Sequence, residues 1–287
     1  MRWSERQRAL LRELGVAPWP ERAAQAGPAV RRSALGAEAA STPPPVDAAP
    51  SAPRAPRLPS AREPGPAKAV VAAAPGAAAA AADPIATLDW TALRAAVASC
   101  RRCALCETRT QTVFGVGHPE ARWMVVGEAP GEQEDRVGEP FVGPAGQLLD
   151  AMLRALGLTR SAAPVAESGV PVDRRVYIAN TLKCRPPRNR NPTPAELLEC
   201  EPYLVRQIAL VAPRIVLAMG RFAVQTLLRS SEPVGRLRGR EHRYQGVPLV
   251  VTYHPAYLLR NPADKARAWE DLCLAAAIAE REGVSLR

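Results

Sequence analysis

Residues 122–135, RWMVVGEAPGEQED, decide the fold. The segment opens with a short apolar run, passes through two glycines and a proline, and ends in an acidic cluster. A strand inside a parallel sheet has such an uninterrupted apolar run, because both of its faces are covered. We therefore predict a buried strand over residues 122–126 that leads directly into a loop beginning at Gly127.

Similar runs recur along the chain and alternate with helical patterns. The further predicted strands are residues 175–179 (RVYIA), 214–219 (RIVLAM) and 248–253 (PLVVTY). The predicted helices lie at about 89–99, 144–156, 194–211, 220–229 and 262–282. Such alternation indicates an α/β fold with a parallel sheet that is flanked by helices. Functional loops then follow the carboxyl ends of the strands, at Gly127, Asn180, Gly220 and His254.

The N-terminal part of the chain has a different composition. Residues 25–84 contain 22 Ala and 12 Pro, and no aromatic residue occurs between Trp19 and Trp90. Such a segment cannot bury a core. Ahead of it, a short helix would present three leucines to the domain or to a protein partner, namely Leu10, Leu11 and Leu14. The predicted organisation is an N-terminal helix region over 1–24, a disordered linker over 25–84 and a folded domain over 85–287.

Composition also limits the class of protein. Lys and Arg number 38 against 28 Asp and Glu, a net charge of +10, which suits a polyanionic partner such as nucleic acid. No charge-free apolar stretch long enough to cross a membrane occurs outside the Ala/Pro-rich part, and residues 1–15 carry charges where a secretory signal needs an apolar segment. Six Cys in 287 residues do not make a disulfide scaffold, so we expect a cytoplasmic protein.

Four of the cysteines form two separated pairs. Cys100 and Cys103 stand in a C-x2-C pattern, and Cys184 and Cys200 are 16 residues apart around a loop rich in Pro and Arg. Two such pairs can converge on one site of four thiolates, which holds either zinc or an iron–sulfur cluster. The spacing alone does not separate these two possibilities.

Other candidate functional residues follow the predicted strands. The acidic residues after Gly131 either complement a helix N-terminus or orient a water molecule. Phe141, in a loop rich in Gly and Pro, is a packing residue or a stacking partner for a flat ligand. His254 directly follows the last strand, a position that favours a functional histidine. Leu258 and Arg260, which we expect to be exposed, suit a wedge and a phosphate contact.

Four motifs, GEAPGEQED, EPFVGPAGQLLD, IANTLKCRPPRNRNP and HPAYLLR, together resemble the family 4 uracil-DNA glycosylases. They occur in the family's order between residues 99 and 260, together with the two cysteine pairs. The resemblance implies a compact α/β domain with a central four-stranded parallel sheet and a four-iron, four-sulfur cluster. It also implies an enzyme of DNA repair that flips uracil out of DNA and hydrolyses its N-glycosidic bond.

The resemblance assigns roles to individual residues. The implied cluster ligands are Cys100, Cys103, Cys184 and Cys200, with Cys106 as a spare cysteine. Phe141 matches the ring that stacks on uracil, Asn180 the amide that reads its edge, and His254 the histidine beside uracil O2. The residues expected to contact DNA are Leu258, Arg260 and Arg188, with Arg185 and Arg190.

One position departs from related glycosylases. Ala129 stands where other uracil-DNA glycosylase families have an Asp that activates water, and an Ala side chain cannot do so. The group that activates water is therefore undecided: it is Glu128 or Glu134, or the mechanism is purely electrostatic.

Two rival interpretations are a non-catalytic DNA-binding or damage-sensing relative, and a relative that is trapped covalently on DNA through a histidine such as His242. We expect a monomer that acts on uracil-containing DNA.

Overall fold

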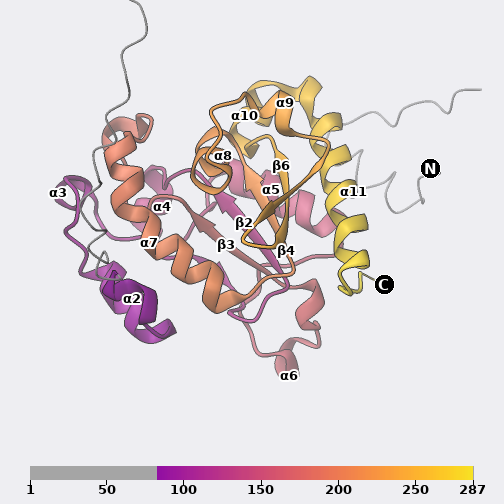
Figure 1. The fold of residues 1–287 in the computed structure, drawn as a ribbon, viewed down its shortest axis with the longest axis horizontal. Coiled ribbons are helices and arrows are strands. Elements are labelled where there is room, and N and C mark those ends of the chain that lie inside the picture. Colours follow the sequence, from indigo (N-terminus) through magenta and orange to yellow (C-terminus); the bar gives the residue numbers. More distant parts are fainter. Residues whose placement is uncertain (1–82, 287) are drawn as a thin grey trace, which may run out of the picture. The chain divides into compact units, whose positions relative to one another are not determined.

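The computed structural model describes residues 83–286 (Figure 1). The predicted N-terminal helix, and the predicted linker as far as residue 82, lie outside the described residues. Asp83 and Pro84, which the sequence analysis places in the linker, belong to the first described turn, the 3₁₀-helix η1 (Pro84–Thr87). The Asp83 carboxylate caps that turn by accepting a hydrogen bond of 3.1 Å from the backbone N–H of Ile85.

A mixed six-stranded sheet forms the centre of the domain, in the order β1-β3-β2-β4-β6-β5. Its four inner strands are parallel, as predicted. The antiparallel edge strands β1 and β5 are additions to the prediction. Both are short and only partly buried, so they carry no apolar run that a sequence pattern would reveal. The strands are β1 (Val116–Gly117), β2 (Trp123–Gly127), β3 (Val176–Asn180), β4 (Ile215–Met219), β5 (Glu241–Tyr244) and β6 (Val247–Thr252).

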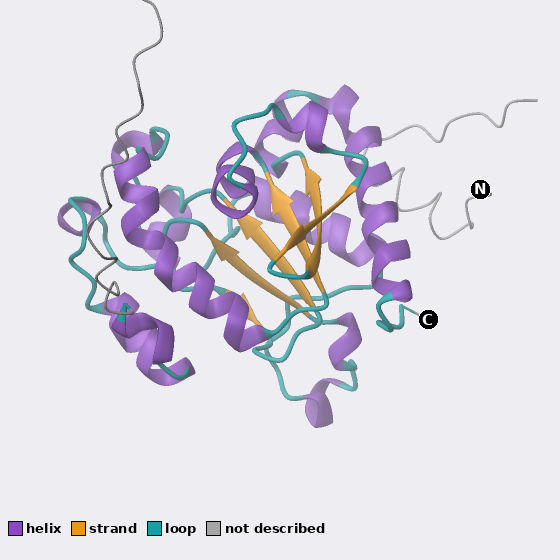
Figure 2. Ribbon diagram, in the orientation of Figure 1, coloured by secondary structure: helices purple, strands orange, loops and turns teal. Residues whose placement is uncertain are grey.

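Helices cover both faces of this sheet (Figure 2). All five predicted helices are present, with ends that differ by a few residues, and several shorter helices lie between them. The α-helices are α2 (Trp90–Ala98), α3 (Leu105–Thr108), α4 (Glu132–Val137), α5 (Pro144–Ala155), α6 (Val165–Ser168), α7 (Pro194–Val211), α8 (Arg221–Leu228), α9 (Val234–Leu237), α10 (Pro255–Arg260) and α11 (Lys265–Arg281). The other 3₁₀-helices are η2 (Val172–Arg174), η3 (Pro187–Asn189) and η4 (Pro262–Asp264).

The core has two layers because successive strand residues point to opposite faces. Val125 of β2 packs in the layer that contains α5 and α11. Its neighbour Met124 packs in the layer that contains α7 and α8. Every residue of β2, β3 and β4 is buried, which explains their uninterrupted apolar runs.

A third apolar cluster joins η1 and α2 to α7. It includes the buried Cys184 and Cys200, with Cys100 and Cys103 packed against it. The two cysteine pairs therefore meet at one side of the domain, next to the segment between β3 and α7. Among the helices of residues 83–286, none combines the length and the apolar composition that crossing a membrane requires.

Candidate active site

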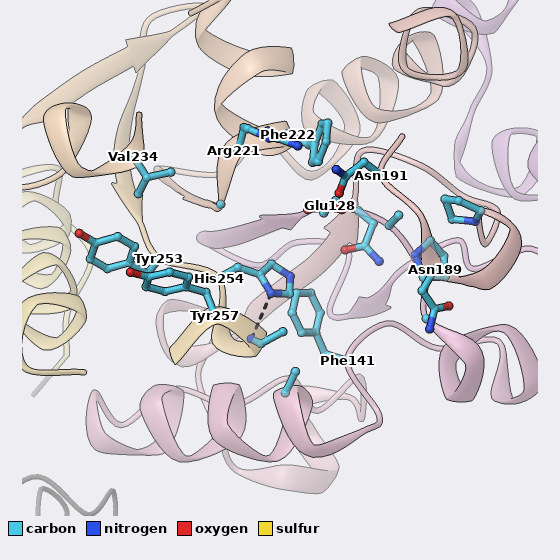
Figure 3. A pocket seen from close by; sticks show the side chains of 18 of the residues that line it. Glu128, Phe141, Asn189, Asn191, Arg221, Phe222, Val234, Tyr253, His254 and Tyr257 are labelled. Atoms are coloured by element: carbon cyan, nitrogen blue, oxygen red, sulfur yellow. Dashed lines mark hydrogen bonds between the residues drawn. The ribbon is translucent and has the colours of Figure 1, made fainter. Parts of the chain in front are cut away.

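The carboxyl ends of the inner strands meet at one edge of the sheet, and a pocket of about 870 Å³ opens there. The register places Gly127 of β2 opposite Asn180 of β3. The next strands bring Gly220 beside Thr252, whose carbonyl accepts the Gly220 N–H at 3.0 Å. Figure 3 shows the side chains that converge on the pocket, among them Glu128, Phe141 and His254. The sequence-predicted loops thus form a single site.

Asn180 occupies the floor of this pocket as the last residue of β3. Its side chain is 3% exposed, and its Oδ1 accepts no hydrogen bond from any described residue. A Cβ at Gly127 would stand 2.4 Å from Asn180 Oδ1 and 2.6 Å from Phe141 Cζ. Glycine is therefore required at position 127 because an amide and an aromatic ring approach the backbone there. The result is a buried acceptor that faces the pocket without a protein partner.

Phe141 is held in an unusual backbone conformation, with φ at 57°. The Arg160 guanidinium donates hydrogen bonds to the carbonyls of Pro140 (2.9 Å) and Phe141 (3.0 Å). The Phe141 ring lies nearly parallel to the His254 ring, with centroids 5.3 Å apart and planes 27° apart (Figure 3). A strained residue that is fixed by its surroundings and aimed into a pocket is typical of a functional site.

His254 caps α10, and this cap fixes the state of its imidazole. Its Nδ1 accepts a hydrogen bond of 3.2 Å from the backbone N–H of Ala256. In the neutral ring, the proton must therefore be on Nε2. Burial lowers the pKa of His254 to about 4, and the positive charge of Arg260 acts in the same direction. His254 is thus a neutral N–H donor at neutral pH.

Glu134 has a structural task in the loops. One carboxylate oxygen accepts from the Gly131 N–H at 3.0 Å, and the other accepts from the N–H groups of Val142 (3.1 Å) and Gly143 (3.4 Å). This carboxylate therefore connects the start of α4 to the loop that carries Phe141. Its lone pairs serve backbone donors, which leaves Glu134 poorly placed to orient a water molecule.

Glu128 is the other carboxylate of the pocket wall. Its side chain is partly buried, and burial raises its pKa, although the charges of Arg221 and Arg260 oppose that rise. Its backbone carbonyl is fixed to the start of the next loop by the Leu182 N–H at 3.1 Å. Ala129 also lines the pocket and offers no polar side chain. The geometry thus favours Glu128 over Glu134 among the two acidic candidates.

The expectation that Leu258 is exposed is wrong. Leu258 is 1% exposed and belongs to the apolar core. It lies three residues after the buried Pro255 on α10, so both residues share the helix face that packs inward. The exposed leucine of this segment is Leu259, at 44%, and Arg260 beside it is also exposed.

The segment between Cys184 and Cys200 forms one wall of the pocket. Its arginines differ in their freedom: Arg185 donates to Asn189 Oδ1 at 2.7 Å, Arg190 pairs with Glu196 (Nη1 to Oε2, 2.9 Å), and Arg188 is exposed. The pocket also contains residues to which the sequence analysis gave no role of their own, among them Asn189, Asn191, Arg221, Tyr253 and Tyr257. Their sequence signals were positional: Arg221 and Tyr253 stand at strand ends, and the other three lie in the quoted motifs.

The predicted cluster ligands line one small cavity away from this pocket. Cys100, Cys103, Cys184 and Cys200 are joined there by Cys106 and by three cationic side chains, Arg102, Arg109 and Lys183. Arg109 Nη1 donates to Cys184 Sγ at 2.9 Å, and the Lys183 backbone N–H donates to Cys200 Sγ at 3.2 Å. Burial raises the pKa of Cys200 to about 12. Within residues 83–286, no three His, Cys, Asp or Glu side chains already surround a single point as ligands of one metal ion.

His242 has no place in the pocket. It belongs to the edge strand β5, and its Nε2 lies 2.7 Å from the carbonyl oxygen of Leu237. The described residues that line the pocket do not include it. The geometry therefore gives no support to a covalent role for this histidine.

Comparison with known proteins agrees with the geometry. Residues 114–273 match the Uracil DNA glycosylase superfamily, and the chain belongs to that superfamily. It is 41% identical over 174 residues to a type-4 uracil-DNA glycosylase of Archaeoglobus fulgidus, covering 58% of this chain and 81% of the relative. A type-4 enzyme of Thermotoga maritima is 38% identical over 191 residues, covering 65% and 93%. A type-5 uracil-DNA glycosylase of Pyrobaculum aerophilum is 37% identical over 150 residues, covering 50% and 66%. Within the superfamily, the chain is a member of the type-4 uracil-DNA glycosylases, which confirms the resemblance found in the sequence.

Proposed function

We propose that this protein removes uracil from DNA by flipping the nucleotide out and hydrolysing its N-glycosidic bond, which leaves an abasic site. The observation that carries the proposal is the buried Asn180 Oδ1, which accepts no hydrogen bond from the described residues and lies beside Phe141 and His254 in an open pocket. Relatives that are named for this activity support it.

Uracil fits the polar groups of this pocket. The Asn180 amide has an acceptor for uracil N3–H and a donor for uracil O4, whereas cytosine presents the opposite pattern at both positions. Phe141 provides a flat surface, and stacking of a base on an aromatic ring contributes about 1–3 kcal/mol in protein–nucleic acid complexes. A base must leave the duplex to reach such a site.

His254 stabilises the charge that develops when the bond breaks. As the N1–C1′ bond breaks, its electron pair remains on uracil, and negative charge accumulates at O2. The Nε2–H of the neutral His254 donates a hydrogen bond to O2 in that state. Water adds to C1′ of the sugar cation and releases a proton, which the Glu128 carboxylate accepts. The negative charge of Glu128 also favours the cationic sugar.

Exposed side chains around the pocket contact the DNA strand. Arg188 and Arg260 are exposed cations that suit phosphate oxygens, whereas Arg190 is paired with Glu196. Leu259, rather than the buried Leu258, is the side chain that can enter the space left by the flipped base.

A four-iron, four-sulfur cluster is the cofactor that we assign to the cysteine cavity. Cys100, Cys103, Cys184 and Cys200 would hold it, and the chemistry of the cavity suits it. Arg109 and Lys183 offset part of the negative charge of four thiolates, whereas Arg102 is paired with Asp83 and Glu199. Cys184 and Cys200 each accept a hydrogen bond of the kind that tunes such clusters. When bound, the cluster would act as a rigid cross-link between the segment after α2 and the loop after β3.

The decisive experiment measures free uracil released from a uracil-containing single strand in a single turnover. The wild-type protein should release it. Asn180→Asp should lose at least about 10³-fold, because the new anion replaces the donor to O4, while discrimination against cytosine relaxes in relative terms. Gln147→Glu makes the same change from amide to carboxylate at an exposed position of α5 outside the described lining of the pocket, and should stay near the wild-type rate. Absence of uracil release by a folded wild-type protein that binds DNA would favour the non-catalytic relative.

A further inference from the structure

The pocket extends well beyond the residues that read uracil. Its volume of about 870 Å³ is near the upper end of the range, about 300–1,000 Å³, that drug-sized ligands occupy, whereas uracil is a single pyrimidine ring. Figure 3 shows Tyr253, Tyr257 and Val234 on one side of His254, away from Asn189 and Asn191 on the other. We call the side formed by Val234, Tyr253 and Tyr257 the aromatic lobe.

The two rings of the aromatic lobe are fixed in place. Tyr253 and Tyr257 stack with centroids 5.0 Å apart and planes 20° apart. The Tyr257 hydroxyl donates to Asp264 Oδ2 at 2.7 Å. The guanidinium of Arg238 lies 5.9 Å from the centroid of the Tyr253 ring and is itself paired with the buried Asp271 at 2.9 Å. The lobe is therefore a prearranged surface.

Both tyrosines are only partly buried: each packs on the apolar core and also lines the pocket. A flat, partly apolar wall in a DNA-binding pocket suits the face of a nucleobase. Arg260 also lines the pocket, three residues after Tyr257 on α10, and therefore on the same side of that helix. A cation at this point suits the phosphate that links two neighbouring nucleotides.

We propose that the aromatic lobe binds the base of the nucleotide next to the flipped uracil. This inference rests on the proposed function, since it needs a uracil in the central part of the pocket. In a duplex, the neighbouring base stays paired and stacked, whereas in a single strand it is free to enter the lobe. The lobe therefore strengthens binding of single-stranded substrate and contributes little on duplex DNA.

The test uses the full chain and short single strands with one uracil, in which the nucleotide on the 5′ or the 3′ side of uracil is replaced by a base-less spacer. Fluorescence anisotropy gives Kd, and uracil release is measured in parallel. Wild-type Kd should rise about tenfold with the spacer on one side only. Tyr257→Leu should show that rise with the ordinary strand and no further rise with the spacer. Tyr257→Phe, which keeps the ring and loses only the hydrogen bond to Asp264, should retain most of the response to the spacer.

Tyr244→Leu is the matched control, because Tyr244 lies on the edge strand β5 and is absent from the described lining of the pocket. It should leave Kd and its response to the spacer unchanged, and thermal unfolding checks that each variant folds. If the wild-type Kd is the same with and without the spacer on either side of uracil, the proposed role of the aromatic lobe is wrong, even if uracil is released. Spacer-sensitive binding without uracil release would instead contradict the proposed function alone. If Tyr257→Leu fails to fold, the spacer series on the wild-type protein still tests whether a base next to uracil contributes to binding.

Discussion

The two walls of the pocket are built in different ways. The floor and the His254 side follow directly from buried parallel strands, so hydrogen-bonded ladders fix them. The opposite wall is a loop in which two consecutive residues, Arg188 and Asn189, have left-handed φ angles of 56° and 55°. Such residues cost about 1–2 kcal/mol each. The hydrogen bond from Arg185 to Asn189 Oδ1, at 2.7 Å, helps to hold this loop. The comparison separates the proposed chemical centre, which is held by strand ladders, from a loop wall that we propose to contact DNA and to be cross-linked by the cluster.

The largest effect is expected on the side of the pocket that the strand ends form, where His254 lies. His254→Ala removes the proposed donor to uracil O2, where charge would appear only in the transition state. The single-turnover rate constant should fall about 10²–10³-fold, while Kd for a strand with an abasic site changes little. Equal losses in rate and in binding would make His254 a DNA contact or a packing residue. His118→Ala, outside the described pocket lining, serves as the histidine control.

At the loop between Cys184 and Cys200, we expect a substitution to weaken DNA binding and to leave the rate constant nearly unchanged. Cys184→Ser removes a proposed cluster ligand, so the purified protein should lose its visible absorption and bind DNA about tenfold more weakly. The rate constant at saturating protein should remain within a few-fold of wild type. Cys106→Ser is a sharp control, because Cys106 lines the same cavity but is not a proposed ligand.

Two results would contradict this view of the cysteine loop. Loss of colour in Cys106→Ser would change the assigned ligand set. A colourless wild-type protein that contains stoichiometric zinc after anaerobic purification would exclude the iron–sulfur cluster.

A smaller effect is expected when the pH is changed, and it distinguishes the proposed roles of Glu128 and His254. Burial raises the pKa of Glu128 above its usual value and lowers that of His254 to about 4. As pH falls below neutrality, Glu128 is therefore the group of this pair that gains a proton first, while His254 remains neutral until the pH approaches about 4. The rate constant should decline with falling pH, and the midpoint of that decline should lie above the usual pKa of a glutamate carboxyl. Glu128→Gln should be slower at pH 7 and nearly independent of pH down to 5. A variant that keeps the acid decline would place the titrating group elsewhere.

The sequence predicts those parts of the site that local patterns determine. Buried parallel strands need uninterrupted apolar runs, so the inner strands, and with them the positions of Asn180 and His254, could be predicted. The edge strand β5 escapes prediction because its residues are only partly buried. Leu258 was misplaced because the inward face of α10 depends on packing against the core, which the short motif does not reveal.

Tertiary structure decides the remaining members of the site. Tyr253 and Tyr257 enter the pocket wall only because β6 and α10 meet there. The acidic run after Gly131 left the choice of base open, and only the folded loops show that backbone N–H groups occupy the Glu134 carboxylate. The family resemblance supplied the remaining roles, since neither composition nor spacing assigns Phe141 to uracil.

The smallest expected effect concerns the N-terminal part of the chain. The pocket and the cysteine cavity are lined by residues from Val97 onward, so deletion of residues 1–82 should leave uracil release from naked DNA unchanged within a few-fold. Deletion of residues 1–84 is the second truncation to compare. It also removes Asp83, whose carboxylate caps η1 and pairs with Arg102 at 2.8 Å. That ion pair is partly exposed and contributes at most about 1 kcal/mol, so the longer deletion should lower the unfolding temperature by a few degrees and spare the chemistry. Thermal unfolding and single-turnover release on both truncations check this. Loss of release in the shorter one would mean that the segment before Asp83 belongs to the catalytic unit.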